Sequence, residues 1–117
     1  ILIIEDEKDL VESLVMTLEE DGYATMASYD SIDANFKLGN QEFSLIILDL
    51  NLQKGYGEAI IKNIKNNSKH VNYKTPIVVA SGGLDKERLM NIKEHISDAL
   101  VKPFDLDNLN DVIKKHT

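Results

Sequence analysis

Short apolar runs alternate with amphipathic segments along the whole chain, and this alternation limits the fold more than any other feature. The apolar runs cover residues 1–4, 23–27, 43–48, 77–80 and 99–101. Apolar runs of this length are typical of buried strands, and helical spacing of apolar residues between them indicates helices. Strands that read as continuous apolar runs favour a parallel sheet covered on both faces. We therefore predict an α/β fold in which strand and helix alternate.

Helical spacing or a helix boundary signal marks each segment that follows a predicted strand. The positions are Val11, Leu14, Val15, Leu18 and Gly22 for the first helix, Asp30 or Ser31 to Leu38 for the second, Ile60, Ile61 and Ile64 for the third, Leu89, Ile92 and Ile96 for the fourth, and Asp105, Leu106, Leu109 and Ile113 for the last. Residues 66–75 are polar and are predicted to form a loop.

Composition excludes several classes of protein. The 117 residues suit one domain, and 43% of them are apolar, enough for a substantial core. A net charge of −7 argues against binding to nucleic acid or to an anionic membrane. Without cysteine there are no disulfides or thiolate metal sites, and no membrane span or signal peptide is visible, so we expect a cytoplasmic protein. The chain begins on Ile1 inside an apolar run, so we expect residues 1–117 to be one domain of a longer chain.

Polar residues stand where four of the predicted strands end. They are Glu5 and Asp6 after the first strand, Asp49 after the third, Ser81 after the fourth and Lys102 after the fifth. The carboxyl ends of parallel strands lie along one edge of a sheet, where ligands bind, so we expect these side chains to meet. Clustered carboxylates repel one another, and a set of oxygen ligands favours Mg²⁺. An aspartate can also accept a phosphoryl group, whose oxygens a lysine and a serine can bind.

Four stretches together resemble the receiver domains of two-component response regulators. They are "ILIIEDE", "LIILDL" with Gly57 eight positions after Asp49, "PIVVASG" and "LVKPF". The resemblance extends over essentially the whole chain. It implies a flavodoxin-like (βα)5 fold, a doubly wound parallel five-stranded sheet in the order 2-1-3-4-5.

The resemblance also implies a role for each residue at the predicted edge. Asp49 would be the phosphoacceptor, with Ser81 and Lys102 contacting the phosphoryl group. Mg²⁺ would be bound by Glu5, Asp6, Asp49 and the backbone carbonyl of Asn51. The Lys102–Pro103 bond would be cis, and Gly82 would leave the approach to the site open.

The function implied is a phosphorylation-controlled signalling switch rather than an enzyme, with only self-phosphorylation and slow self-dephosphorylation. A histidine kinase or a histidine phosphotransfer protein would donate the phosphoryl group. The output would go to a downstream protein or to a tethered domain, without direct contact with nucleic acid or membrane.

Some positions depart from the family pattern. Glu5 stands where Asp is commoner, Ser81 where Thr is commoner, and Gln53 where the family usually has Pro. Ala99 replaces the Tyr or Phe that usually swings inward on activation, so the space for that ring must be smaller or be filled by a neighbour such as Leu84 or Leu100. We therefore expect the Gly82–Gly83 backbone to relay the signal, because glycine pairs leave a loop free to move.

Other functions remain open at this point. A phosphorylation-independent pseudo-receiver would use the same fold only to dock proteins. A flavodoxin-like cofactor site would need a phosphate-binding loop after the first strand, where "EDEKD" would repel the anion. A metal-dependent phosphatase would need a general acid near Asp49, where Asn51 stands. Each edge residue alone also has a structural interpretation, such as a helix cap or a surface charge.

Overall fold

The structure, a computed structural model, describes residues 1–52, 57–82 and 86–117 of the chain. Its elements are β1 (Leu2–Ile4), α1 (Lys8–Glu20), β2 (Met26–Ser28), α2 (Ser31–Asn40), β3 (Ile46–Asp49), α3 (Gly57–Lys65), β4 (Ile77–Gly82), α4 (Lys86–Ile92), the 3₁₀ turn η1 (Lys93–His95), β5 (Asp98–Lys102) and α5 (Leu106–His116). None of the described helices is both long and apolar enough to cross a membrane.

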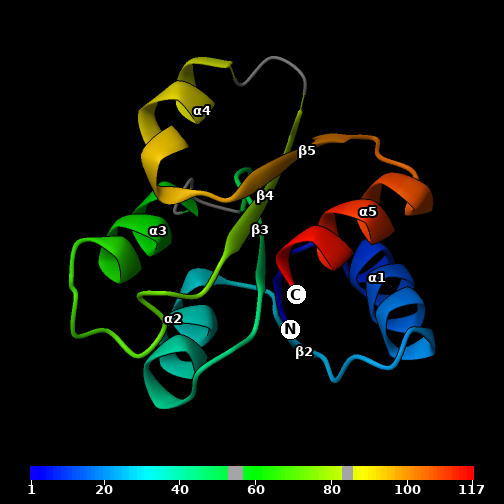
Figure 1. Cartoon of the computed structure of the whole chain (residues 1–117), viewed down its shortest axis with the longest axis horizontal. Coiled ribbons are helices and arrows are strands. Elements are labelled where there is room, and N and C mark those ends of the chain that lie inside the picture. Colours follow the sequence, from blue (N-terminus) through cyan, green and yellow to red (C-terminus); the bar gives the residue numbers. More distant parts are fainter. Residues whose placement is uncertain (53–56, 83–85) are drawn as a thin grey trace.

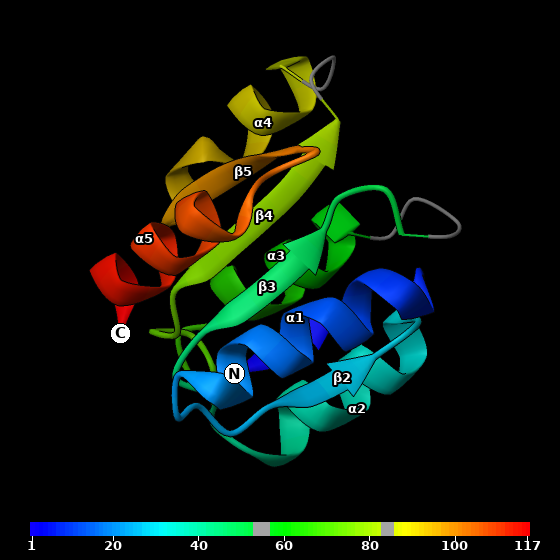
Figure 2. The same cartoon turned by 90° about the vertical axis from the view of Figure 1, so that its right-hand side faces the viewer.

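The strands form one parallel five-stranded sheet in the order β2-β1-β3-β4-β5, which confirms the predicted fold. The arrowheads of β2, β3 and β4 point toward the same edge of the sheet (Figure 2). Helices α1 and α5 cover one face, and α2, α3 and α4 cover the other (Figure 1). The carboxyl ends of all five strands therefore lie along one edge of the sheet, between the two helical layers.

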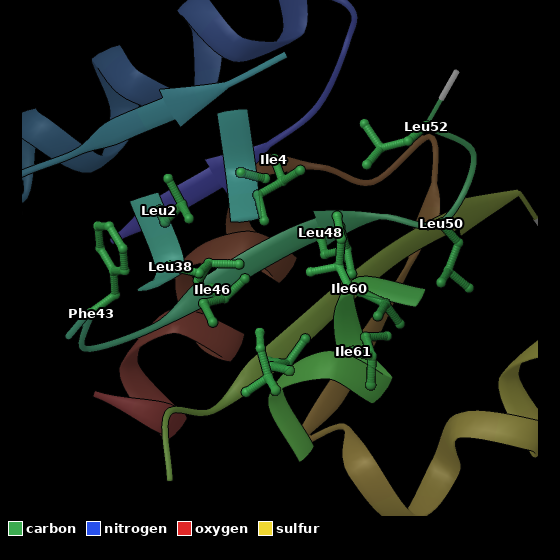
Figure 3. Packing of buried hydrophobic residues seen from close by; sticks show 14 of the residues in the cluster. Leu2, Ile4, Leu38, Phe43, Ile46, Leu48, Leu50, Leu52, Ile60 and Ile61 are labelled. Atoms are coloured by element: carbon green, nitrogen blue, oxygen red, sulfur yellow. The ribbon is translucent and has the colours of Figure 1, made fainter. Parts of the chain in front are cut away.

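Neighbouring strand residues pack into opposite faces of the sheet, as the two-residue period of a strand requires. Ile46 and Leu48 pack with Leu38 of α2 and Ile60 of α3 (Figure 3). Ile47 packs on the other face with residues of α1 and α5. Both faces of the central strands β1, β3 and β4 are covered, so these strands have no polar side, and this explains why they read as apolar runs. The outer strands β2 and β5 are more exposed.

Local signals end or begin the helices as predicted. Gly22 follows α1 with a φ of 90°, a conformation that residues with a Cβ rarely adopt. The Asp30 side chain accepts a hydrogen bond from the Asp33 N–H at 2.8 Å and caps α2. Asp105 caps α5 through the Asn108 N–H at 2.7 Å. These contacts satisfy backbone N–H groups that the helices cannot pair internally.

The boundaries of two strands differ from the prediction. Residues 23–27 were expected to be a strand, but the Tyr23 N–H donates to the Leu18 carbonyl and so caps the C-terminal end of α1, and β2 begins only at Met26. Phe43 is buried but precedes β3, because its N–H donates to the side chain of Asn72 rather than to a strand. An apolar residue can therefore be buried next to a strand without belonging to its hydrogen-bonded ladder.

The fourth and fifth helices also differ from their predicted stripes. Helix α4 ends at Ile92 and continues only as the short turn η1, so Ile96 lies outside it and packs on the core from a loop. Leu106 begins α5 but is 51% exposed, and Leu109 and Ile113 alone form the buried face of the predicted stripe. A residue in the first turn of a helix can face solvent even where the spacing fits.

A buried polar network ties the opposite edge of the sheet together. Asn72, fully buried in the predicted loop, donates through Nδ2 to the carbonyl oxygens of Leu38 at 2.7 Å and Gln41 at 2.8 Å. Its Oδ1 accepts from the Phe43 N–H at 2.8 Å and lies 3.0 Å from the Thr75 hydroxyl. The loop is therefore held to the end of α2 and to the approach to β3.

Candidate functional site

The side chains predicted at the strand ends do come together on one edge of the sheet. Asp49 is the last residue of β3. Ser81 is the penultimate residue of β4 and Lys102 is the last residue of β5, so both lie within their strands rather than after them. Glu5 comes directly after β1, and its N–H donates to the Ser28 carbonyl of β2. Glu5, Asp49 and Ser81 are buried, whereas Asp6 is partly exposed. Burial of these polar groups costs free energy unless they are paired, so the edge is not an ordinary part of the apolar core.

Three carboxylates form a compact cluster at this edge. One oxygen from each of Glu5, Asp6 and Asp49 lies within 4.8 Å of the other two. Glu5 also accepts a hydrogen bond through Oε2 from the Asp6 N–H at 3.0 Å. An all-oxygen set of this kind suits a hard divalent cation, which would relieve the repulsion between the carboxylates.

Lys102 reaches this cluster from β5. Its Nζ lies 2.6 Å from Glu5 Oε1 and 3.4 Å from Asp49 Oδ1. Burial acts to lower the pKa of Lys102, but the hydrogen bond to Glu5 and the charges of Asp49 and Glu5 outweigh it and raise that pKa. Burial and then the nearby Asp49 raise the pKa of Glu5 to about 7, against the opposing effect of Lys102. One lysine thus compensates only part of the negative charge.

The backbone around Asp49 is closely packed. The Asn51 N–H donates to Asp49 Oδ1 at 2.9 Å and so fixes the carboxylate. A Cβ on Gly57 would lie 3.1 Å from both the Asp49 carbonyl oxygen and the Leu50 Cα, too close for an unstrained side chain. The glycine eight positions after Asp49 therefore lets the start of α3 approach the end of β3.

Ser81 is fully buried, and its hydroxyl oxygen has no hydrogen-bond partner among the described residues. Asn110 Oδ1 of α5 is the other such side-chain atom in that part of the chain. A buried hydroxyl without a partner is costly, and such groups often mark a place where a ligand completes the hydrogen bonds. Gly82 follows and pairs in register with Lys102, whereas Gly83 and Gln53 lie outside the described residues.

Two further predicted positions flank this edge. Ala99 of β5 is partly buried and packs on the α2–α4 side of the sheet together with Leu89 and Ile96. Leu100 was one of two candidates to fill the space beside Ala99, but it packs on the opposite face, because the side chains of adjacent strand residues point to opposite faces of the sheet. Leu84, the other candidate, lies outside the described residues. The Lys102–Pro103 peptide bond is cis.

The structure adds two residues that the sequence did not single out. Arg88 of α4 forms an ion pair with Glu58 of α3, and its guanidinium also contacts Leu50 and Asn51 beside Asp49. Arg88 and Glu58 are separated by 30 positions and stand in different helices. No spacing rule links them, so only the packing of α3 against α4 reveals the pair.

Comparison with known proteins gives the family of this chain. Residues 1–114 match the family described as "Response regulator receiver domain". The transcriptional regulatory protein PmrA of Pectobacterium parmentieri is 33% identical over 93% of this chain and 48% of its own length. The transcriptional regulatory protein CrdR of Helicobacter pylori is 32% identical over 98% of this chain and 53% of its own. The chain therefore spans about half the length of these curated relatives.

Solved structures agree as well. A response-regulator signal receiver domain from Bermanella marisrubri has a TM-score of 0.85 at 30% identity, covering 98% of this chain and 94% of that one. A two-component response regulator from Clostridium difficile has a TM-score of 0.86 at 30% identity, covering 97% of this chain and 91% of its own. The fold and the family match thus coincide, and the chain belongs to the receiver domains of two-component response regulators.

Proposed function

We propose that Asp49 is the phosphoacceptor of this receiver domain and that Ser81 and Lys102 bind the phosphoryl group. The observation that carries the proposal is the Ser81 hydroxyl, which is buried without a partner among the described residues. It stands one position beyond Ala80, the residue that pairs with Asp49 across β3 and β4. A phosphoryl oxygen bound there would accept the hydrogen bond that the folded chain does not provide.

In the proposed transfer, a carboxylate oxygen of Asp49 attacks the phosphorus atom of a phosphohistidine. The new P–O bond forms as the P–N bond breaks, and the imidazole keeps the electron pair and takes up a proton. Lys102, now 2.6 Å from Glu5, would contribute its ammonium charge to a phosphoryl oxygen. The Asn51 N–H, already at Asp49 Oδ1, would hold the nucleophile in place during the attack.

The carboxylate cluster fits the Mg²⁺ that receiver domains use. Glu5, Asp6 and Asp49 would hold the ion together with the backbone carbonyl of Asn51, an all-oxygen set that suits a hard cation. Bound there, Mg²⁺ would supply positive charge that offsets the negative charge of the phosphoryl group and of the carboxylates. Burial and then Asp49 raise the pKa of Glu5 although Lys102 lowers it, so the ionised form of Glu5 is disfavoured without a further cation, and this supports a cation at this place.

The donor we propose is a histidine kinase or a histidine phosphotransfer protein, and the location is the cytoplasm. The chain spans about half of relatives that are named as transcriptional regulators, so we propose residues 1–117 as the receiver part of a longer chain with an output domain. The signal would leave through the Ser81–Gly82 segment and α4. The domain's own chemistry would be limited to gaining and slowly losing the phosphoryl group.

Intact mass spectrometry tests this proposal. Treatment with acetyl phosphate and Mg²⁺ should add the mass of one phosphoryl group to wild-type protein and none to Asp49→Asn. Asp107→Asn is the matched control, because Asp107 is an exposed carboxylate of α5, and this variant should react like wild type. Absence of a mass gain in wild type, or an equal gain in Asp49→Asn, would favour a docking module that works without phosphorylation.

A further inference from the structure

Arg88 joins three parts of the molecule through one guanidinium group. Helices α3 and α4 lie on the same side of the sheet (Figure 1), and Arg88 extends from α4 to the Glu58 carboxylate of α3. Nε and Nη2 donate to the two carboxylate oxygens at 2.9 and 2.6 Å, a bidentate pairing. Nη1 donates to Asn51 Oδ1 at 2.7 Å, and Nη2 to the Leu50 carbonyl at 2.5 Å.

The last of these contacts bears directly on the acceptor. The Leu50 carbonyl and the Asn51 N–H belong to the same planar peptide group. Arg88 binds the carbonyl end of this group, while the N–H end donates to Asp49 Oδ1 at 2.9 Å. Fixing one end of a rigid plane limits where the other end can point. A charged donor on the carbonyl also polarises the amide and makes its N–H a stronger donor.

Glu58 keeps the guanidinium in this position. The hydrogen bond from Arg88 lowers the pKa of Glu58 despite partial burial, so the carboxylate stays ionised and the pair has no net charge. The guanidinium contacts Leu50 and Asn51, the two residues that follow Asp49, and without Glu58 its charge would also be attracted to the carboxylate cluster of Glu5, Asp6 and Asp49. Held by Glu58, Arg88 instead acts on the backbone next to the acceptor.

We propose that Arg88 is a positioning residue for phosphoryl transfer to Asp49, acting through the Leu50–Asn51 peptide; this inference rests on the function proposed above. Phosphorylation removes charge from the Asp49 carboxylate and so weakens the acceptor of the Asn51 N–H. The same peptide is bound to α4 through Arg88, so the state of Asp49 and the position of α4 are linked. Such a linkage is reciprocal, and a change at α4 also alters the acceptor.

The experiment compares wild type with Arg88→Ala, Arg88→Lys and, as a control, Lys93→Ala. Lys93 is an exposed cation of η1, directly after α4, and its side chain makes no hydrogen bond or ion pair with the described residues of the site. Its loss therefore removes the same charge as the loss of Arg88 without removing the guanidinium contacts. Two quantities are measured well below the unfolding temperature of each variant. They are the NMR shift of the Asn51 amide proton and the rate of phosphorylation by acetyl phosphate at saturating Mg²⁺.

Both Arg88 variants should move the Asn51 amide proton upfield and slow phosphorylation about tenfold, as loss of a supporting contact typically does. Lysine should not rescue either quantity, because it cannot reproduce the planar fork. Lys93→Ala should match wild type in both. The amide of Asn72, at the far edge of the sheet, should keep its shift in every variant, which separates positioning from a general loss of structure.

Different results overturn different statements. Arg88 variants that are less stable but keep the wild-type rate and Asn51 shift would give Arg88 a structural role only and would overturn the inference. Rescue by Arg88→Lys would show that charge rather than orientation matters and would also overturn it. In both cases a phosphorylated wild type leaves the proposed function intact. If wild-type protein takes up no phosphoryl group, the proposed function fails and this inference fails with it.

Discussion

The sheet has one buried polar cluster at the amino ends of its strands, here called the amino edge, and another at their carboxyl ends, the carboxyl edge. The two clusters differ in how their hydrogen bonds are completed. At the amino edge, Asn72 uses both amide hydrogens and its carbonyl oxygen in bonds to the backbone of α2 and to the approach to β3. At the carboxyl edge, Ser81 has no hydrogen-bond partner among the described residues. There Glu5 and Asp49 share one lysine.

The difference separates a structural network from a binding site. A polar cluster that satisfies its own groups stabilises and orders the fold, and an added ligand would find no unused donor or acceptor there. A cluster that leaves a hydroxyl unpaired and carboxylates crowded costs stability in the free protein. It gains that stability back when a cation and an anionic group bind. In the free protein, one buried polar cluster therefore contributes favourably to stability and the other unfavourably.

The largest expected effect is at Asn72. Asn72→Ala leaves the Phe43 N–H and the Leu38 and Gln41 carbonyls without their side-chain partner. A buried group that loses its hydrogen bond costs about 1–3 kcal/mol, so we expect this variant to lose about 3 kcal/mol of unfolding free energy. Urea denaturation of the wild type and the variant measures it.

Asn67→Ala is the matched control in the same loop. Asn67 is exposed, and its Oδ1 accepts only from the Lys69 N–H at 3.1 Å among the described contacts of that side chain. Its loss should change stability by no more than about 0.5 kcal/mol. At a temperature where Asn72→Ala is still folded, phosphorylation of Asp49 should proceed at the wild-type rate. Equal losses in the two variants would contradict a structural role for the amino-edge network.

The second effect is a pH dependence that comes from the carboxyl edge. In metal-free protein the pKa of Glu5 is raised from 4.5 to about 7, first by burial and then by Asp49. Between these values the folded state binds more protons than the unfolded chain, so the unfolding free energy falls as pH rises. The stability contributed by protonated Glu5 is complete below pH 4.5 and is lost as pH passes through about 7.

Glu5→Gln tests this prediction, because glutamine cannot ionise. In EDTA at about pH 8 the variant should be more stable than wild type by an amount on the order of 2 kcal/mol, and the difference should shrink toward about pH 4. Glu12→Gln, at an exposed position of α1, should follow the wild-type pH profile. A wild-type stability that rises from pH 4.5 to 7 relative to Glu5→Gln would show that the carboxylate is already compensated without metal.

A pair of hydroxyl deletions compares the two edges directly. The Thr75 hydroxyl lies 3.0 Å from both the Phe43 carbonyl and Asn72 Oδ1, so Thr75→Val should cost about 1 kcal/mol. The unpartnered Ser81 hydroxyl costs stability in the free protein, so Ser81→Ala should be at least as stable as wild type. Only Ser81→Ala should slow phosphorylation. Equal stability losses would mean that the Ser81 hydroxyl is bonded in the free protein.

Much of the fold could be predicted from the sequence because its periodicities are strong. The strand around Ile3 and the helix around Leu14 follow directly from apolar spacing. Boundaries were less accurate, because they depend on where backbone groups find partners. The Tyr23 N–H is bound by a carbonyl of the last turn of α1, and the Phe43 N–H is bound by a side chain that is 29 positions away. Such partners cannot be read from a local pattern.

The site shows the same division. Asp49 and Lys102 could be expected to meet because parallel strands place their carboxyl ends at one edge, whatever the details of packing. Asn72 was part of a segment predicted only as a polar loop, and nothing in the sequence singled out Arg88. Their roles depend on contacts between distant elements, so neither residue has a sequence signal of its own.

The smallest expected effect concerns Mg²⁺, which should stabilise one edge and leave the other unaffected. A ligand that binds only the folded state adds RT ln(1 + [L]/Kd), which is about 0.8 kcal/mol when Mg²⁺ is present at about three times its dissociation constant. Urea denaturation with Mg²⁺, against NaCl of equal ionic strength, should show this gain in wild type. Asp6→Asn should lose more than half of it, because Asp6 belongs to the carboxylate cluster. Asn72→Ala should keep the whole gain from its lower starting stability, because effects at separate sites add. If the gain disappears in Asn72→Ala, the two edges do not act independently. If the gain persists unchanged in Asp6→Asn, the carboxyl edge is not where the ion stabilises the fold.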